Sequence, residues 1–309
     1  MLCAMTELNL PLVRVKIILE VEEPSKLPRH LFSPLRGVLG ANLKRISCVA
    51  RRYSQCLECP LNQHCAYGYI FETPRPEDAE RLRLYPYLPH PFTITPPYPT
   101  PQDRTMSLGL TLVGRAIQYF PHFVLSIEAA GEKGLGRYKV PFKIKDILDA
   151  SNGSSLYSPS TRTLLPPNLI PHFPTRECHT LTLKFLTPLS LRFQGMVADP
   201  QNFSFHVLLR NLLRRVSALS YFHVGQELKL DFKGLVEAAQ EIETVDQNLR
   251  FVKIKRYSAR TKREMPLQGL VGQVSFEGNI TPFTPLLEAG SLVHVGKNTS
   301  FGLGHYSLE

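Results

Sequence analysis

HVGKNTSFGLGHY (His294–Tyr306) lies close to the end of the chain, and its last five residues, GLGHY, almost repeat GLGRY (Gly134–Tyr138). In both places a strand pattern and a helix pattern precede the glycine loop, and a short strand pattern follows it. MSLGLTLVG and RAIQYFPHFVLSIEAAG lead to the first loop, whereas GLVGQVSFEG and NITPFTPLLEAG lead to the second. The same order of elements around two similar loops predicts an internal duplication.

Each half also opens with a strand pattern and a helix pattern of its own. In the first half, a strand is predicted over Leu10–Glu22, and a helix with Ser33 as its N-cap is predicted to run to Ile46. Gly37 and Gly40 lower the helix propensity there, so we expect close packing against a neighbour at both positions. In the second half, the strand pattern is HTLTLKFLTPLSL and the helix pattern covers residues 203–222.

The resulting order in each half is strand, helix, strand, strand, helix, strand. This is the order of ferredoxin-like folds, in which two helices cover one side of an antiparallel sheet. We therefore expect an α+β protein with two tandem ferredoxin-like (RRM-like) domains, over residues 1–150 and 176–309. The polar, proline-rich stretch Asp149–Thr175 is predicted to be the linker, and residues 47–75 are predicted to be a cysteine-rich insertion in the first domain.

The composition limits the class of partner. The chain has 309 residues, is 43% hydrophobic and 20% charged, and can therefore bury a sizeable core. Its 36 Lys and Arg against 26 Asp and Glu, a formal charge of +10, favour a polyanion such as nucleic acid or an anionic membrane face. No apolar run approaches the length of a membrane span, and the opening MLCAMTELNL lacks a secretory pattern, so we expect a cytoplasmic protein that does not enter a membrane.

The C-terminal glycine loop differs from a nucleotide-binding P-loop. Five residues separate Gly290 from Gly296, and Asn298 follows Lys297 where a P-loop needs Ser or Thr for magnesium. One interpretation is that the glycines only form tight turns. The interpretation that we favour is that the backbone N–H groups of the loop and Lys297 contact a phosphodiester chain.

The stretch RFVKIKRYSARTKR (Arg250–Arg263) has seven basic residues in 14 and no acidic ones. In a strand, the apolar residues of this stretch face one side and the lysines the other, where they can meet phosphates. A solvated basic face without a ligand is the alternative. The predicted nucleic-acid contacts in this stretch and in the glycine loop are Arg250, Lys253, Lys255, Arg256, Arg260, Lys297, Gly302, Gly304 and His305.

Four of the six cysteines fall within 18 residues, in the pattern Cys48-x7-Cys56-x2-Cys59-x5-Cys65. Thiolates bind zinc as a tetrahedron, and a C-x2-C pair brings two sulfur atoms to one ion from a tight turn. We therefore predict a structural zinc site whose role is in folding. An iron–sulfur cluster, free thiols and a disulfide remain alternatives.

Five stretches together resemble one known family. LRGVLGANLKR, LTLVGRAIQYFPHF, GEKGLGRY, RYSARTKREMPLQGLVGQVSFEG and the last 15 residues are similar to the CRISPR repeat-processing endoribonucleases of the RAMP superfamily. The resemblance implies an antiviral-defence enzyme that binds CRISPR repeat RNA and cleaves it to guide RNAs without a catalytic metal or cofactor. The 2′-hydroxyl would attack the adjacent phosphate and leave a 2′,3′-cyclic phosphate. Other CRISPR effector subunits are implied as partners.

Two other functions remain open from the sequence. The glycine loop is also found in RAMP subunits that bind RNA without cutting it, so a non-catalytic subunit is the first alternative. The second is a zinc-dependent nucleic-acid module unrelated to CRISPR, which would require the duplication to be accidental.

The resemblance also indicates where catalytic residues are to be sought. Many family members place a histidine at or after the first helix, but the helix Pro34–Ile46 of this chain has none. His30, just before it, is therefore the predicted general acid or base. Lys44 is expected to neutralise charge on the phosphorane, and Tyr53 to orient the 2′-hydroxyl.

Overall fold

The computed structural model describes residues 7–309 except 54, 77, 83–86 and 259–262. The chain forms two compact units. The N-terminal unit consists of Leu12–Leu169 and Phe222–Val224, and the C-terminal unit consists of the chain up to Pro11, Ile170–Tyr221 and Gly225–Glu309. The change of unit between Leu169 and Ile170 falls within the proline-rich stretch.

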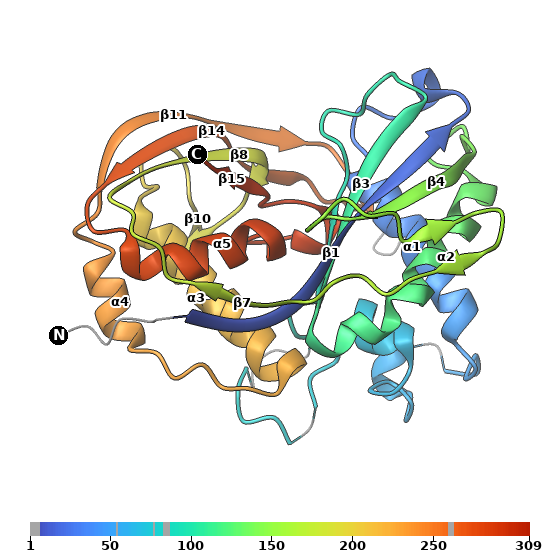
Figure 1. Ribbon diagram of the computed structural model, residues 1–309, viewed down its shortest axis with the longest axis horizontal. Coiled ribbons are helices and arrows are strands. Elements are labelled where there is room, and N and C mark those ends of the chain that lie inside the picture. The colour runs from blue at the N-terminus through green and yellow to red at the C-terminus, as the bar shows by residue number, and fades with distance from the viewer. Residues whose placement is uncertain (1–6, 54, 77, 83–86, 259–262) are drawn as a thin grey trace. The chain divides into compact units, whose positions relative to one another are not determined.

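The N-terminal unit contains a sheet of antiparallel neighbours in the order β2-β3-β1-β4. Two helices that pack on each other, α1 and α2, cover one face of this sheet (Figure 1). In chain order, these elements are β1 (Glu7–Val21), α1 (Phe32–Ser47), β2 (Phe92–Thr95), β3 (Thr105–Val113), α2 (Phe120–Lys133) and β4 (Phe142–Asp149).

The core of this unit follows the predicted periodicities. Every second residue of β1 from Val13 to Val21 is buried, and these side chains share one apolar cluster with Leu35, Leu39 and Leu43 of α1. The helix begins one residue before the predicted cap, at Phe32, and its N-cap residue is Leu31, so the prediction of Ser33 as the N-cap was wrong.

The C-terminal unit repeats this topology. Its sheet has the order β11-β14-β8-β15, again with antiparallel neighbours, which matches β2-β3-β1-β4 element by element. The elements are β8 (Thr180–Leu189), α3 (Phe205–Leu219), β11 (Glu243–Ile254), β14 (Leu267–Glu277), α5 (Thr284–Val293) and β15 (Tyr306–Leu308). The predicted α+β class with two ferredoxin-like folds is thereby confirmed, and α3 and α5 lie under their sheet in Figure 1.

Short strands, a short helix and several helical turns connect the helices and strands of the two units. The short strands are β5 (Tyr157–Ser158), β6 (Thr163–Leu164), β7 (Ile170–Pro174), β9 (Arg192–Phe193), β10 (Met196–Val197), β12 (Tyr257–Ser258) and β13 (Arg263–Glu264), and α4 spans Phe232–Ala238. The 3-10 turns are η1 (Pro24–Lys26), η2 (Cys56–Glu58), η4 (Gly114–Tyr119), η6 (Thr281–Phe283) and η7 (Thr299–Phe301), and the π-helical turns are η3 (Gly68–Glu72) and η5 (Ser220–Val224). Within the described residues, no helix has both the length and the hydropathy that crossing a membrane requires.

One arginine of α3 is buried, which the amphipathic pattern does not predict. The Nε–H group of Arg215 donates a 2.9 Å hydrogen bond to the carbonyl of Val293, at the end of α5. Burial lowers the pKa of Arg215 to about 9. The bond satisfies a carbonyl that the helix end would otherwise leave unpaired, so Arg215 joins α3 to α5.

The two glycines of α1 differ in their surroundings. A Cβ atom on Gly40 would lie 2.8 Å from Cε1 of Phe71, so the close packing predicted there is present. A Cβ atom on Gly37 would have no neighbour within 4 Å, and the prediction of close packing at Gly37 was wrong. In α2, by contrast, a Cβ atom on Gly131 would run into the backbone carbonyl of Phe142.

We predict opposite effects of alanine at two of these positions. Gly37→Ala should raise the free energy of unfolding by about 1 kcal/mol, because alanine is the better helix former and the space is open. Gly131→Ala should lower it by about 1–3 kcal/mol, because helix and strand must move apart. Urea unfolding of both variants measures this. Equal destabilisation by the two changes would contradict the packing described for α1.

Candidate functional site

The C-terminal glycine loop, between α5 and β15, is held against the end of β8 by its own backbone. The N–H groups of Lys297 and Gly304 donate to the carbonyls of Ser190 (2.9 Å) and Pro188 (3.1 Å). The hydroxyl of Thr187 donates to the carbonyl of Gly302 at 2.8 Å and accepts from the N–H of His305 at 3.0 Å. These N–H groups are therefore engaged inside the unit, and the expectation that they are exposed to a ligand was wrong for these positions.

Glycine is required at two positions of this loop for steric reasons. Gly296 has φ +87° and Gly304 has φ +73°, in the left-handed region that other residues rarely adopt. A Cβ atom would also collide with the carbonyl of Ser190 at the first position and with that of Val295 at the second. The glycines therefore fix the shape of the loop, and its side chains are what it presents to a ligand.

Lys297 and Arg192 form a pair of like charges beside the loop. The Lys297 side chain is exposed at the loop, and Arg192 is an exposed residue of β9. Partial desolvation of the ammonium first, and then the positive charge of Arg192, lower the pKa of Lys297. An anion near both groups would relieve this repulsion. Arg192 was not predicted as a site residue, because nothing in its sequence neighbourhood distinguishes it from other surface arginines.

Two aromatic contacts fix further predicted side chains on the loop. The guanidinium of Arg256 lies 4.4 Å from the ring centroid of Phe301, and burial lowers the pKa of Arg256. The ring of His305 stacks on that of His294, with 4.9 Å between centroids and 24° between planes. His294 is itself buried, and its Nδ1 donates to the carbonyl of Leu303 at 3.2 Å. Arg256 and His305 are thus each held against an aromatic ring of the loop.

The remaining predicted contacts lie along an edge strand. β11 is the outermost strand of its sheet, and Arg250 and Lys253 are exposed on it. They differ by an odd number of positions and so lie on opposite faces, with Lys253 facing away from Ile254, which is buried. Lys255 lies just beyond the strand. Arg260 falls outside the described residues.

In the N-terminal unit, His30 lies two residues before α1. Its ring is 5.4 Å from that of Tyr98 and 6.3 Å from that of Phe32, centroid to centroid. Its Nδ1 atom is buried and has no hydrogen-bond partner among the described residues. Burial, and secondarily the charge of Arg29, lower the pKa of His30 from the usual value, so the imidazole is neutral at pH 7.

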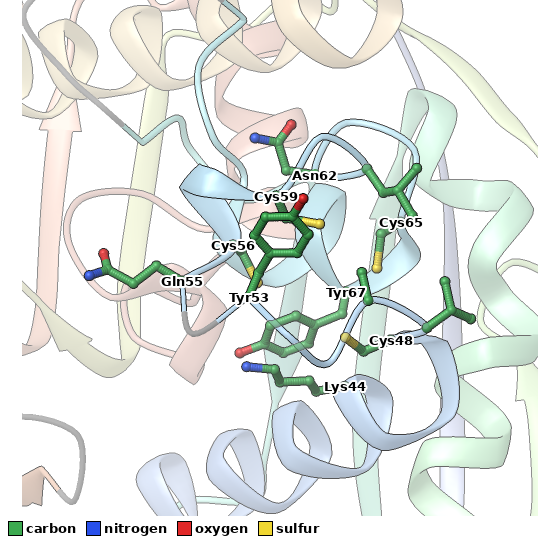
Figure 2. A pocket seen from close by; sticks show the side chains of 13 residues that line it. Lys44, Cys48, Tyr53, Gln55, Cys56, Cys59, Asn62, Cys65 and Tyr67 are labelled. Carbon is green, nitrogen blue, oxygen red and sulfur yellow. The ribbon is translucent and has the colours of Figure 1, made fainter.

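The structure does not bring Lys44 and Tyr53 to His30. Lys44 is in the last turn of α1, twelve residues after Phe32, which is about 18 Å along the helix axis. Lys44 and Tyr53 instead line one pocket together with all four clustered cysteines (Figure 2). The ammonium of Lys44 lies 5.5 Å from the ring centroid of Tyr67, and Arg52 donates a 3.3 Å hydrogen bond to the hydroxyl of Tyr53.

The four cysteines of this pocket are free thiols in the structure. Burial, then Glu72, raise the pKa of the Cys56 thiol, Lys44 lowers it, and Cys65 and Cys48 raise it further. In the described part of the chain, no group of three or more His, Cys, Asp or Glu side chains is arranged to hold a metal ion. The predicted zinc site thus remains a prediction.

The chain matches two known protein families, one in each half. Residues 10–169 match the family AF_1859_N, described as an N-terminal domain, and residues 183–306 match the family CRISPR-associated endoribonuclease Cas6. Among curated proteins, no relative matches this chain.

Several solved structures share the fold. A Cas6 product complex is 18% identical, with a TM-score of 0.58, and the match covers 96% of this chain and 100% of that one. Cas6 of Thermus thermophilus is 16% identical, with a TM-score of 0.56, over 97% of this chain and 99% of the other. A partial Cas6-RT-Cas1–Cas2 complex is 13% identical, with a TM-score of 0.54, over 97% of this chain and 46% of that one.

These matches and the duplicated ferredoxin-like topology define a RAMP protein of the CRISPR systems. The chain belongs to the Cas6 family of CRISPR-associated, repeat-processing endoribonucleases, with an N-terminal domain of the AF_1859_N type. This membership excludes the zinc-dependent module unrelated to CRISPR.

Proposed function

We propose that the chain cleaves CRISPR repeat RNA to guide RNAs by attack of the substrate's own 2′-hydroxyl, without a catalytic metal. The products are then a 2′,3′-cyclic phosphate and a 5′-hydroxyl. The observation that carries this proposal is the state of His30, a neutral imidazole with a buried, unpartnered nitrogen just before α1. A neutral imidazole accepts a proton at pH 7, as activation of a 2′-hydroxyl requires.

The start of α1 supplies a second element of this chemistry. The helix dipole is positive at this end. Pro34 has no N–H group and the N–H of Leu35 donates to the carbonyl of Leu31 at 3.0 Å, so it is the dipole that supplies positive potential here. Since His30 precedes Phe32 by two residues, a phosphate near the imidazole is also near this end of the helix. The helix dipole stabilises the developing phosphorane charge, the role first expected of Lys44. Lys44, about 18 Å away along the helix, and Tyr53, which lines the same pocket as Lys44, contact another nucleotide in this proposal.

In this proposal RNA is bound by the C-terminal unit, along the glycine loop and the exposed edge of β11. Support comes from the like-charge pair of Lys297 and Arg192 and from Arg256, which is fixed on Phe301. Exposed lysines along the strand add contacts with the phosphates without reading the sequence. The repeat is recognised in the cytoplasm. A similar solved structure is a Cas6-RT-Cas1–Cas2 complex, so Cas1–Cas2 is the kind of CRISPR protein proposed as a partner.

The separation of His30 from Lys44 and Tyr53 favours one competing function, that of an RNA-binding subunit without activity. The two proposals agree on RNA binding and differ in the products. An inactive subunit leaves the repeat intact under all conditions. The enzyme cuts it once at a defined position.

The functional test is single-turnover cleavage of repeat RNA in EDTA, with analysis of the new ends. We predict one cut that leaves a 2′,3′-cyclic phosphate. His30→Ala should lower the rate by about 100-fold or more, the usual contribution of a positioned acid–base group. RNA affinity should change little, because one neutral ring adds little to a phosphate-dominated interface.

The pH dependence provides the control for this assignment. The reaction needs the unprotonated imidazole and His30 has a lowered pKa, so the rate should be constant near pH 7 and fall only at a pH below the ordinary histidine value of about 6.5. His122→Ala is the matched variant, since His122 also has a buried, unpartnered Nδ1 but is a residue of α2. Equal loss of activity in both variants would contradict a specific role for His30.

The RNA path is tested by charge reversal. Lys253→Glu with Lys255→Glu should weaken RNA binding and make the logarithm of the binding constant fall less steeply with the logarithm of salt concentration, because fewer counterions are released. Lys229→Glu with Lys233→Glu makes the same change of charge at exposed sites of this unit, away from β11. If the control pair lowers the salt dependence as much as the test pair, the proposed path is wrong.

A further inference from the structure

The segment that carries the four cysteines has no hydrophobic anchor of its own. Leu43 before it and Ala66 after it are buried, but between Lys44 and Cys65 no described hydrophobic side chain is. Val49 is 84% exposed, and Ile46, Leu57 and Leu61 are exposed as well. A segment of this length that fully buries no hydrophobic side chain gains little to offset the conformational entropy that it loses on ordering. Another interaction must hold it.

Three separate turns direct the cysteines to one place. Cys48 directly follows α1, and its N–H group donates to the carbonyl of Lys44 at 2.9 Å. Cys56 and Cys59 enclose the 3-10 turn η2, where the N–H of Cys59 donates to the carbonyl of Cys56 at 3.2 Å. Cys65 ends a further turn, with its N–H 2.8 Å from the carbonyl of Leu61. In Figure 2 the four sulfur atoms lie around the same pocket.

We propose that Cys48, Cys56, Cys59 and Cys65 bind one zinc ion, which fastens residues 48–65 to the C-terminal end of α1. The cavity between them has a volume of about 30 Å³, which is enough for one or two water-sized occupants. That space suits a single metal ion. Zinc holds each of four thiolates at about 2.3 Å, so one ion can join all three turns.

The charges around the pocket suit this occupant. Zinc with four thiolates has a net negative charge, and the C-terminal end of a helix is also negative. The positive side chains of Lys44 and Arg45, in the last turn of α1, partly neutralise both negative charges. Lys44 also lines the pocket itself. Lys44 therefore stabilises the negatively charged metal site, and this role is independent of any contact with RNA.

The test is the metal content of the whole chain, purified without added metal. We expect about one zinc per chain, and release of that zinc by a thiol reagent should lower the melting temperature by roughly 5 °C or more. Substituting Co²⁺ for the released zinc should produce the charge-transfer absorption of thiolate-bound cobalt. None of these readouts depends on RNA cleavage, so the zinc proposal and the proposed function can fail separately.

Matched variants complete the test. Cys56→Ser and Cys59→Ser should lose the zinc and melt at a lower temperature, whereas Cys178→Ser, at a free cysteine of the C-terminal unit, should keep both. Absence of metal from the wild type, iron in place of zinc, or oxidised thiols in the cluster would each overturn the proposal. Retention of a full zinc equivalent by both serine variants of the C-x2-C pair would also overturn it.

Discussion

The hydroxyl of Thr187 joins the end of β8 to the C-terminal glycine loop, and the shape of the proposed RNA-binding surface depends on that attachment. The hydroxyl donates to Gly302 and accepts from His305, while neighbouring backbone groups of β8 bind Lys297 and Gly304. A loop held in this way loses little further entropy when it meets a ligand. It also presents fixed side chains, since its N–H groups are largely used by the protein itself.

In the N-terminal unit, the length of α1 imposes a second constraint. His30 lies before its first turn, and Lys44 lies in its last turn beside the cysteine pocket. A rigid helix keeps these two ends apart, so one phosphate cannot contact both. The proposed acid–base chemistry therefore belongs to the start of α1, and the proposed metal belongs to its end, where it stabilises a segment without a hydrophobic core.

The sequence predicted the fold because the fold depends on periodic patterns of neighbouring residues. Strand and helix periodicities on both sides of GLGRY and GLGHY were enough to predict two ferredoxin-like units, and the buried positions of β1 and α1 follow them. The candidate site was harder to predict from the sequence. Arg192 approaches Lys297, and Arg215 bonds to Val293, across many residues of sequence, and no local pattern encodes such contacts. Likewise, short distance in sequence suggested that His30, Lys44 and Tyr53 act together, whereas the rise of a helix separates them.

The central claim is that the substrate RNA supplies its own nucleophile. The most direct measurement uses repeat RNA with a single 2′-deoxy nucleotide at the position of the cut, under single-turnover conditions. The account predicts that this RNA binds with unchanged affinity and is not cleaved at that position, whereas a 2′-deoxy nucleotide one position away leaves cleavage intact. Cleavage of the RNA that lacks the 2′-hydroxyl at the cut would show that the nucleophile comes from elsewhere and would contradict the account.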